Sequence, residues 1–275
     1  MKLIRTLHES INEYANLIIF CENKILYDQN EKSYIFNPKD LNLKEVNGPF
    51  LAIAKVNDRY IYVINIDSKD EILGIFMNPN DTNFVDLINI LTFLDNDSFL
   101  LISRASMLNN WNINNSYCSY CGNKNEFDLE EGAFTCKCKK APNYPSISPC
   151  IITLIYDEQR ILLGRNKFFP KNMYSTLAGF IEAGENAEQA LIREILEEVN
   201  VKVSKIEYHS SQSWPFPSQL MLGYKCKYES GEIILNDKEL EDAKWFNINE
   251  LPNIPPETSI SGKLIRSYIE DHLKL

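Results

Sequence analysis

Short apolar runs that pair across turn-prone residues fill the N-terminal part of the chain. Residues 17–21 are followed in this way by 24–27, and residues 51–56 by 60–66, each time across two or three polar residues. Runs of this length and composition predict β-hairpins. From Phe84 to Trp111 the apolar residues instead recur at helical spacing, so this region is expected to end in helices.

An asparagine-rich stretch separates this region from a group of cysteines. Most residues from Asn109 to Ser116 are asparagine or serine, which favour turns and indicate a connection. We therefore expect an α+β N-terminal domain over residues 1–112 and a segment organised by cysteines over residues 113–143. Strand-like runs after residue 146 then open a third domain, residues 144–275.

The third domain contains a strong helix signal. Asn186 can cap a helix that begins at Ala187, and Gln189 stands three residues after the cap, where its side chain can complete a capping box. The apolar residues of this helix fall on one side. Three carboxylates lie one turn apart on another face: Glu194, Glu197 and Glu198.

Carboxylates gathered on one helix face repel one another, which destabilises the helix unless a cation lies between them. Oxygen-rich groups of this kind suit Mg²⁺ or Mn²⁺, and such an ion can bridge a diphosphate and lower the pKa of an attacking water. The alternative is a solvated acidic face, which is the usual meaning of a glutamate-rich helix. We favour the metal site because the acidic residues follow Gly179 at a defined spacing.

That spacing, Gly-x5-Glu-x7-Arg-Glu-apolar-x-Glu-Glu, resembles the box of the Nudix pyrophosphohydrolases. The resemblance implies that the last three glutamates bind metal, that the arginine orients a glutamate through a salt bridge, and that Glu198 is a candidate for activating water. Where the box ends in glycine, this chain has Asn200, which we expect to adopt the left-handed conformation after the helix. The implied catalytic residues are Glu185, Arg193, Glu194, Glu197 and Glu198.

Composition restricts the remaining chemistry. The chain has 28 basic and 38 acidic residues and a net charge of -10, which disfavours non-specific binding of nucleic acid. No apolar run approaches the ~18 residues of a membrane helix, and the N-terminus has no secretory hydrophobic segment, so we expect a cytoplasmic protein without a membrane partner. The three histidines belong to no recognisable catalytic motif.

The chain has seven cysteines, an odd number that argues against a paired disulfide framework. The pair Cys118 and Cys121 precedes Cys136 and Cys138 by a spacing typical of zinc ribbons, in which thiolates complete a tetrahedral Zn²⁺ site. The second pair is Cys-x-Cys, which presents both thiols on one side when the backbone is extended. We expect a structural zinc; the alternative is a redox-active thiol pair. The other three are expected in the core: Cys21, Cys150 and Cys226.

Residues 211–221 read Ser-Gln-Ser-Trp-Pro-Phe-Pro-Ser-Gln-Leu-Met. In isolation such a segment indicates either a packed loop corner or an aromatic wall on which a flat base stacks, with Gln212 at the edge of the base. The segment resembles the Ser-Gln-Pro-Trp-Pro-Phe-Pro-x-Ser signature of NADH pyrophosphatases of the NudC type, from which Ser213 and Gln219 depart. Shorter matches extend the resemblance over nearly all of the chain after residue 98.

The resemblance to NudC-type enzymes implies a fold and further site residues. The fold is α+β, with a C-terminal Nudix α/β/α sandwich around a mixed sheet, preceded by a zinc ribbon and an α+β N-terminal domain. Glu239 is implied as a fourth metal ligand, and Tyr144, in a homodimer, as acting across the subunit interface. The implied substrate-binding residues are Tyr144, Ala178, Phe180, Gln212, Trp214, Pro215, Phe216, Glu239 and Ser261.

These patterns lead to the hypothesis of a Mg²⁺- or Mn²⁺-dependent hydrolase that splits NADH or NAD⁺ into the nicotinamide mononucleotide and AMP. The family resemblance extends the hypothesis to the removal of NAD caps from RNA. One alternative is Nudix hydrolysis of another nucleoside diphosphate derivative, such as ADP-ribose, FAD or a dinucleoside polyphosphate. The other is a non-catalytic nucleotide- or RNA-binding zinc protein.

Overall fold

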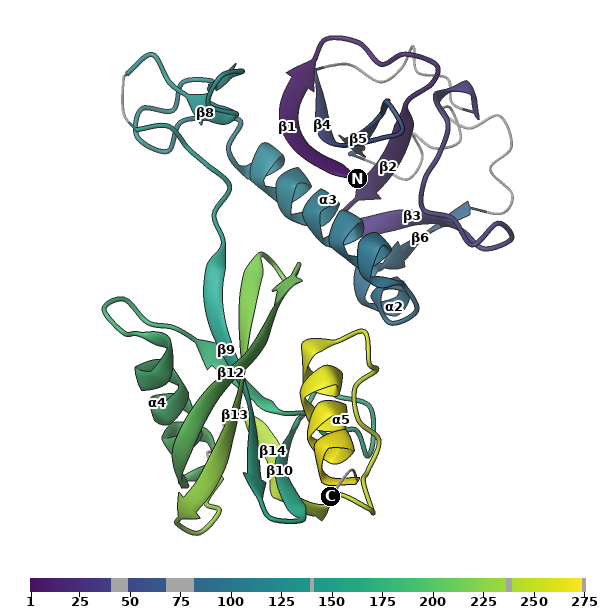
Figure 1. Ribbon diagram of the computed structural model, residues 1–275. Helices are drawn as coiled ribbons and strands as arrows, with labels where there is room; N and C mark the ends of the chain where they lie inside the picture. The colour runs from purple at the N-terminus through teal and green to yellow at the C-terminus, as the bar shows by residue number, and fades with distance from the viewer. Residues whose placement is uncertain (41–48, 68–81, 139–140, 236–238, 274–275) are drawn as a thin grey trace. The chain divides into compact units, whose positions relative to one another are not determined.

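The computed structural model describes residues 1–40, 49–67, 82–138, 141–235 and 239–273 (Figure 1). The chain divides into two compact units, Met1–Ser146 and Ile147–Leu275. Among the helices within the described ranges, none has the length and apolar content that crossing a bilayer requires.

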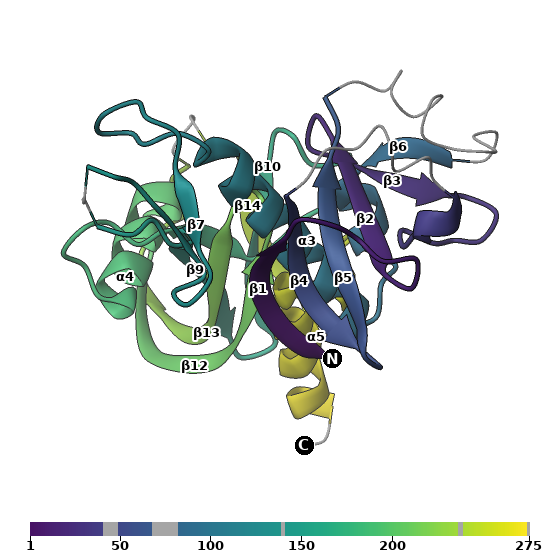
Figure 2. The ribbon, with the colours of Figure 1, turned by 90° about the horizontal axis from the view of Figure 1, so that it is seen from above.

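A six-stranded sheet forms the body of the first unit (Figure 2). Both predicted hairpins are confirmed. Strand β2 (Asn16–Cys21) pairs with β3 (Lys24–Asp28), and β4 (Phe50–Val56) pairs with β5 (Arg59–Asn65), in antiparallel fashion. Their central turn residues have positive φ, as in type I′ turns: Glu22, Asn23, Asn57 and Asp58. In spatial order the strands are β1 (Lys2–His8), β4 (Phe50–Val56), β5 (Arg59–Asn65), β2 (Asn16–Cys21), β3 (Lys24–Asp28) and β6 (Thr82–Asp86).

Helices follow strand β6, as the apolar spacing predicts. A short 3₁₀ turn, η1 (Pro38–Asp40), lies earlier, between β3 and β4. Helix α2 (Leu87–Leu91) leads into α3 (Asn96–Asn114), whose first turn is capped by Asp95, which accepts from the Ser98 amide. The expected start of the helical region at Phe84 is wrong, because Phe84 belongs to β6 and pairs with Leu26.

The asparagine-rich stretch is also not a connection, because α3 continues to Asn114. Asn109 is 2% exposed, and its side-chain amide donates to Asn65 Oδ1 in the neighbouring sheet. Trp111, two residues later, is buried as well. Tertiary packing and this hydrogen bond thus outweigh the weak helix propensity of asparagine.

The cysteine segment lies at the C-terminal end of α3 and contains a two-stranded sheet, β7 (Glu126–Asp128) and β8 (Ala133–Thr135). The Trp111 ring lies 4.8 Å from the Phe134 ring and 6.2 Å from the Phe127 ring. Arg5 of β1 donates to the carbonyl of Gly132. The small hairpin is therefore anchored on the helix and on the edge of the N-terminal sheet.

The second unit is an α/β/α sandwich, as expected from the family resemblance. Helices α4 (Ala187–Val199) and α5 (Ile260–Leu273) lie on opposite faces of its sheet (Figure 1). Adjacent side chains of the central strand β9 (Ser148–Asp157) point to opposite faces: Ile151 packs with α4, whereas Ile152 packs with α5. The sheet is mixed, since β13 and β9 are parallel. Its strands are β12 (Lys202–Trp214), β13 (Gln219–Ser230), β9 (Ser148–Asp157), β10 (Arg160–Asn166) and β14 (Leu240–Asn247), with β11 (Leu177–Phe180) paired to β9.

Candidate active site

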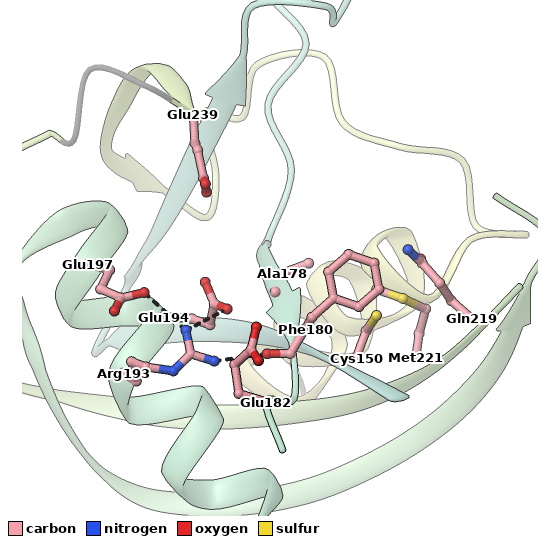
Figure 3. Close-up of a pocket in the computed structure, with 11 residues that line it drawn as sticks. Cys150, Ala178, Phe180, Glu182, Arg193, Glu194, Glu197, Gln219, Met221 and Glu239 are labelled. Carbon is pink, nitrogen blue, oxygen red and sulfur yellow. Dashed lines mark hydrogen bonds and ion pairs between the residues drawn. The ribbon is translucent and has the colours of Figure 1, made fainter. Parts of the chain in front are cut away.

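A cleft of about 470 Å³ opens in the second unit (Figure 3). Carboxylates gather on one side of strand β11, and an aromatic ring, two sulfur-containing side chains and an amide gather on the other. The cleft residues are Cys150, Ala178, Gly179, Phe180, Glu182, Arg193, Glu194, Glu197, Gln219, Met221 and Glu239.

Helix α4 carries the carboxylates, and its ends form as the sequence predicts. The Asn186 side chain accepts from the Gln189 amide at 2.8 Å, and the Gln189 side chain accepts from the Asn186 amide at 3.0 Å. This reciprocal pair is a capping box. At the other end Asn200 has φ 58°, in the left-handed region. Local sequence therefore fixes where the helix begins and ends.

Arg193 holds the glutamates in place through a network of ion pairs. Its guanidinium donates to both oxygens of Glu185, at 2.7 and 2.9 Å, and to Glu194 at 2.8 Å and Glu197 at 3.0 Å. The fork of Arg193 lowers the pKa of Glu185 to about 2. Arg193 also donates to the carbonyl of Phe180, which ties helix α4 to strand β11.

Three carboxylates converge behind this network. One oxygen from each of Glu194, Glu198 and Glu239 lies within 4.8 Å of the others. Glu198 is 6% exposed, and its Oε2 has no hydrogen-bond partner among the residues that the structure describes. Burial, with Glu194 and Glu239 close by, raises the pKa of Glu198 to about 8, and burial also raises that of Glu194.

This donor set fits a hard divalent cation. A buried carboxylate with an unpartnered oxygen, such as that of Glu198, is unfavourable. A cation between it and the two neighbouring carboxylates would neutralise their charge and satisfy the free lone pairs. Glu194, Glu198 and Glu239 are the residues placed to hold it. Glu197, the remaining predicted ligand, lies outside this set of converging oxygens but lines the cleft, 3.0 Å from Arg193.

Gly179 lies directly against the carboxylate of Glu194. A Cβ at position 179 would meet Glu194 Cδ at 2.0 Å and both carboxylate oxygens within 2.4 Å. Real side chains do not approach so closely, so only glycine lets Glu194 reach this position. The first glycine of the box therefore has a packing role that the spacing alone does not reveal.

The other half of the cleft is a recess beside an exposed aromatic ring. Phe180 is 47% exposed. The strand register places it opposite Cys150, which in turn is opposite Met221. The three side chains form a row across β11, β9 and β13 (Figure 3). A flat ring can stack on Phe180 above the two sulfur atoms.

Several predicted substrate-binding residues lie outside the residues that line the cleft. The Gln212 side chain donates to the carbonyl of Thr258 and accepts from the Ile260 amide, both at 2.7 Å, which fixes the start of α5. Ser261 Oγ accepts from the amide and hydroxyl of Thr176. None of the following predicted substrate-binding residues is among the described cleft residues: Gln212, Trp214, Pro215, Phe216 and Ser261.

Four cleft residues were absent from the predicted site residues. Cys150 was expected only as a core residue, and it is indeed 3% exposed. Gln219 and Met221 lie two residues apart on β13, so their side chains lie on the same face of the sheet. Recognition of this segment as a strand could have predicted that the two side chains lie together. Glu182, the fourth, follows Phe180 in the loop before α4 and gave no signal in the sequence.

Four of the five cysteines of the first unit also converge: Cys118, Cys121, Cys136 and Cys138. Their sulfur atoms all lie within 4.8 Å of one another, with Cys118 and Cys138 separated by 3.8 Å and Cys121 and Cys136 by 3.4 Å. Thiolates around a tetrahedral Zn²⁺, with Zn–S bonds of about 2.3 Å, are about 3.8 Å apart. Backbone amides of Cys121 and Tyr120 lower the pKa of Cys118 to about 7. The cluster thus fits zinc.

Tyr144, one of the implied substrate-binding residues, belongs to the first unit. Its side chain is 45% exposed, and its hydroxyl donates to Glu131. The exposed part of the ring is accessible to a ligand or another chain.

Comparison with known proteins identifies the family of the chain. Residues 147–268 match the NUDIX domain. A protein of Pseudomonas aeruginosa named NAD-capped RNA hydrolase NudC is 35% identical over 256 residues, which cover 92% of this chain and 88% of that protein. A protein of the same name from Stutzerimonas stutzeri is 32% identical, over 93% of this chain and 90% of its own length. A NUDIX hydrolase structure from Nitrosomonas europaea aligns with a TM-score of 0.49 and 23% identity, over 58% of this chain and 93% of that one. Because the similarity to the Pseudomonas protein extends over nearly the whole length of both chains, this chain belongs to the NudC family of Nudix-domain proteins.

Proposed function

We propose that the protein is a Mg²⁺- or Mn²⁺-dependent pyrophosphohydrolase that cleaves NADH and NAD⁺ to the nicotinamide mononucleotide and AMP. One observation carries the proposal: Glu194 and Glu239, whose carboxylates converge with that of buried Glu198, line the same cleft as an exposed aromatic ring. A dinucleotide needs both features, a cation site for its diphosphate and an apolar wall for a base. The names of the relatives extend the proposal to NAD-capped RNA.

The residues in and directly behind the cleft have separable roles in this reaction. A bound divalent ion would supply charge neutralisation at the diphosphate and acidify the attacking water. Burial and the neighbouring carboxylates raise the pKa of Glu198 to about 8, so without a cation it is largely protonated at neutral pH. Its ionised form, which a divalent ion beside it would favour, can accept the proton from that water. Arg193 keeps Glu185, Glu194 and Glu197 in fixed positions. Hydrolysis adds the water across one P–O bond of the anhydride and releases two monophosphates.

Five further statements belong to the same proposal. The four cysteines hold a structural Zn²⁺. The protein is a homodimer in which Tyr144 acts across the subunit interface, and it acts in the cytoplasm. The chain comprises residues 1–112, 113–143 and 144–275 as N-terminal, zinc-binding and catalytic parts. Residues of the aromatic signature outside the cleft, such as Gln212, act by shaping the pocket walls.

The test is hydrolysis of NADH, NAD⁺, ADP-ribose, FAD and diadenosine tetraphosphate by purified protein with Mg²⁺ or Mn²⁺, with products separated by chromatography. We expect NADH to be preferred and to give AMP and reduced nicotinamide mononucleotide. Preference for another substrate would support the alternative Nudix specificity. Absence of cleavage of every substrate would support a non-catalytic binding protein.

A matched pair of variants on α4 tests the metal site itself. Glu198→Gln removes a ligand and the proposed base, and we expect at least about a 100-fold loss of turnover because residues of this kind contribute that much or more. Glu188→Gln changes an exposed glutamate in the first turn of the same helix and should leave turnover unchanged. Equal activity in the two variants would refute the assignment.

A further inference from the structure

The apolar half of the cleft ends in a single polar side chain, Gln219. It is the first residue of β13, where it pairs with Trp214 of β12 on one side and Ser148 of β9 on the other. Its backbone is thus fixed between two strands. Since side chains alternate along a strand, Gln219 lies on the same face as Met221, while Leu220 between them lies on the opposite face.

The carboxamide of Gln219 is available for a ligand. Its side chain is half-buried and directed along the recess toward Phe180 (Figure 3). Within the described parts of the chain, it has no hydrogen-bond partner, although it lines the cleft. An amide that offers one donor and one acceptor side by side, at the end of an apolar recess, matches a partner with the complementary pair.

We propose that Gln219 is a specificity-determining residue that pairs with the edge of the base stacked on Phe180. The inference rests on the proposed function and names which feature of the substrate this part of the cleft recognises. The partner edge carries an adjacent donor and acceptor. NADH and NAD⁺ have two such edges, the carboxamide of nicotinamide and the amino and ring-nitrogen edge of adenine.

The geometry also explains why the residue type matters here. Serine, which stands at this place in the NudC-type signature, has a single hydroxyl that donates and accepts at one atom, so it cannot pair with two adjacent groups at once as a carboxamide can. Gln219 extends beyond Cβ and presents both groups in one plane. Planar pairing fits a ring that is itself held flat against Phe180, which is 47% exposed.

Two dinucleotide analogues distinguish the two edges. Nicotinic acid adenine dinucleotide replaces the carboxamide by a carboxylate, and nicotinamide hypoxanthine dinucleotide replaces the adenine amino group by a carbonyl. For each protein variant, kcat/KM for NAD⁺ is divided by kcat/KM for each analogue. The corresponding ratios of dissociation constants are measured by equilibrium binding with Ca²⁺ in place of Mg²⁺. Binding is then measured even when no turnover occurs.

In Gln219→Ser we expect one of the two ratios to fall by about 10-fold, the loss of a good hydrogen-bonded pair, and the affected analogue identifies the base. Gln219→Glu keeps the size and one acceptor but loses the donor, so the same ratio should change. Leu220→Ser, on the opposite face of the strand, should leave both ratios as in the wild type.

Unchanged ratios in Gln219→Ser, in both hydrolysis and binding, overturn the inference, and so does an absence of measurable binding by the wild type. Failure of the proposed function has a different result. In that case no dinucleotide is cleaved by the wild type, while the binding ratios still show whether Gln219 discriminates between the analogues.

Discussion

At the scale of single residues, the contact between Gly179 and Glu194 decides whether the metal site can form. We predict that Gly179→Ala displaces the Glu194 carboxylate, because the added Cβ would lie 2.0 Å from Cδ. Hydrolysis and affinity for Mg²⁺ should fall by about 10- to 100-fold, as expected when a ligand loses its orientation. Titration of activity with Mg²⁺ measures the effect, and thermal unfolding checks that the fold is retained. An unchanged Mg²⁺ dependence would contradict the prediction.

Glu198 gives the second residue-scale prediction, on pH. Its pKa is raised from 4.5 to about 8, mainly by burial, so the folded protein holds a proton that the unfolded chain releases. Without added Mg²⁺ or Mn²⁺, this contribution to stability is complete below about pH 4.5 and is lost as the pH rises through about 8. The thermal midpoint should therefore decline over that window.

Glu198→Gln supplies the comparison, because glutamine cannot ionise. Its thermal midpoint should decline less than that of the wild type between pH 5 and about pH 9. Added Mg²⁺ should raise the wild-type midpoint most at the alkaline end, where the carboxylate is ionised and free to bind. Parallel pH profiles for the two proteins would show that Glu198 does not titrate in this window.

Residue identities in the candidate site were predictable to different degrees. Arg193 and the helix glutamates follow from spacing, because one helix turn brings them together. Glu185 precedes the helix, and its place in the box pointed to it. Glu239 lies far along the chain, and only the family resemblance pointed to it. The partners of Gln212 could not be foreseen, since they depend on where α5 begins relative to β12. Contacts set by tertiary packing leave no local pattern in the sequence.

At the scale of elements, α4 was predictable from its own residues, whereas α3 was not. The capping box and the left-handed Asn200 are encoded locally. In α3 the asparagines were expected to end the helix. Instead the helix continues to Asn114, because Asn109 is buried against the N-terminal sheet and Trp111 against the hairpin of β7 and β8. Local signals thus predict an element only where no long-range contact outweighs them.

The C-terminal residue of α4 makes this testable. Asn200 has φ 58°, where glycine is unstrained and a side chain such as alanine is not. Asn200→Gly should change the free energy of unfolding little, whereas Asn200→Ala should lower it by about 1 kcal/mol. Denaturant unfolding of both variants measures the difference. Equal stability of the two would show that backbone conformation does not limit this position.

The cysteine segment, which contains β7 and β8, gives a second prediction at this scale. Cys118→Ser should abolish bound zinc and lower the thermal stability of the first unit, because the two short strands β7 and β8 cannot hold the segment alone. Lys137→Ala, which changes the exposed residue between Cys136 and Cys138, should retain zinc. Metal analysis of the purified proteins measures this. Equal zinc content in the two variants would contradict the cluster as the zinc site.

At the scale of the whole molecule, charge separates recognition of the cap from recognition of the RNA chain. The net charge is -10, and Arg193 is the sole basic residue among the described residues that line the cleft. Arg193 is already paired with Glu185, Glu194 and Glu197. The phosphates of an RNA chain beyond the cap therefore meet little positive charge here, and binding energy has to come from the dinucleotide end.

This argument predicts how cleavage of NAD-capped RNA depends on salt. Each phosphate contact of a single strand adds about -0.7 to the slope of log kcat/KM against log salt concentration. With NADH as reference at constant Mg²⁺, the slope for capped RNA should be steeper by less than about 1, which corresponds to about one contact. A difference beyond about 2 would reveal several phosphate contacts and hence a basic RNA-binding surface. Since both substrates share the same diphosphate and cation site, the difference between the slopes isolates the contribution of the RNA chain.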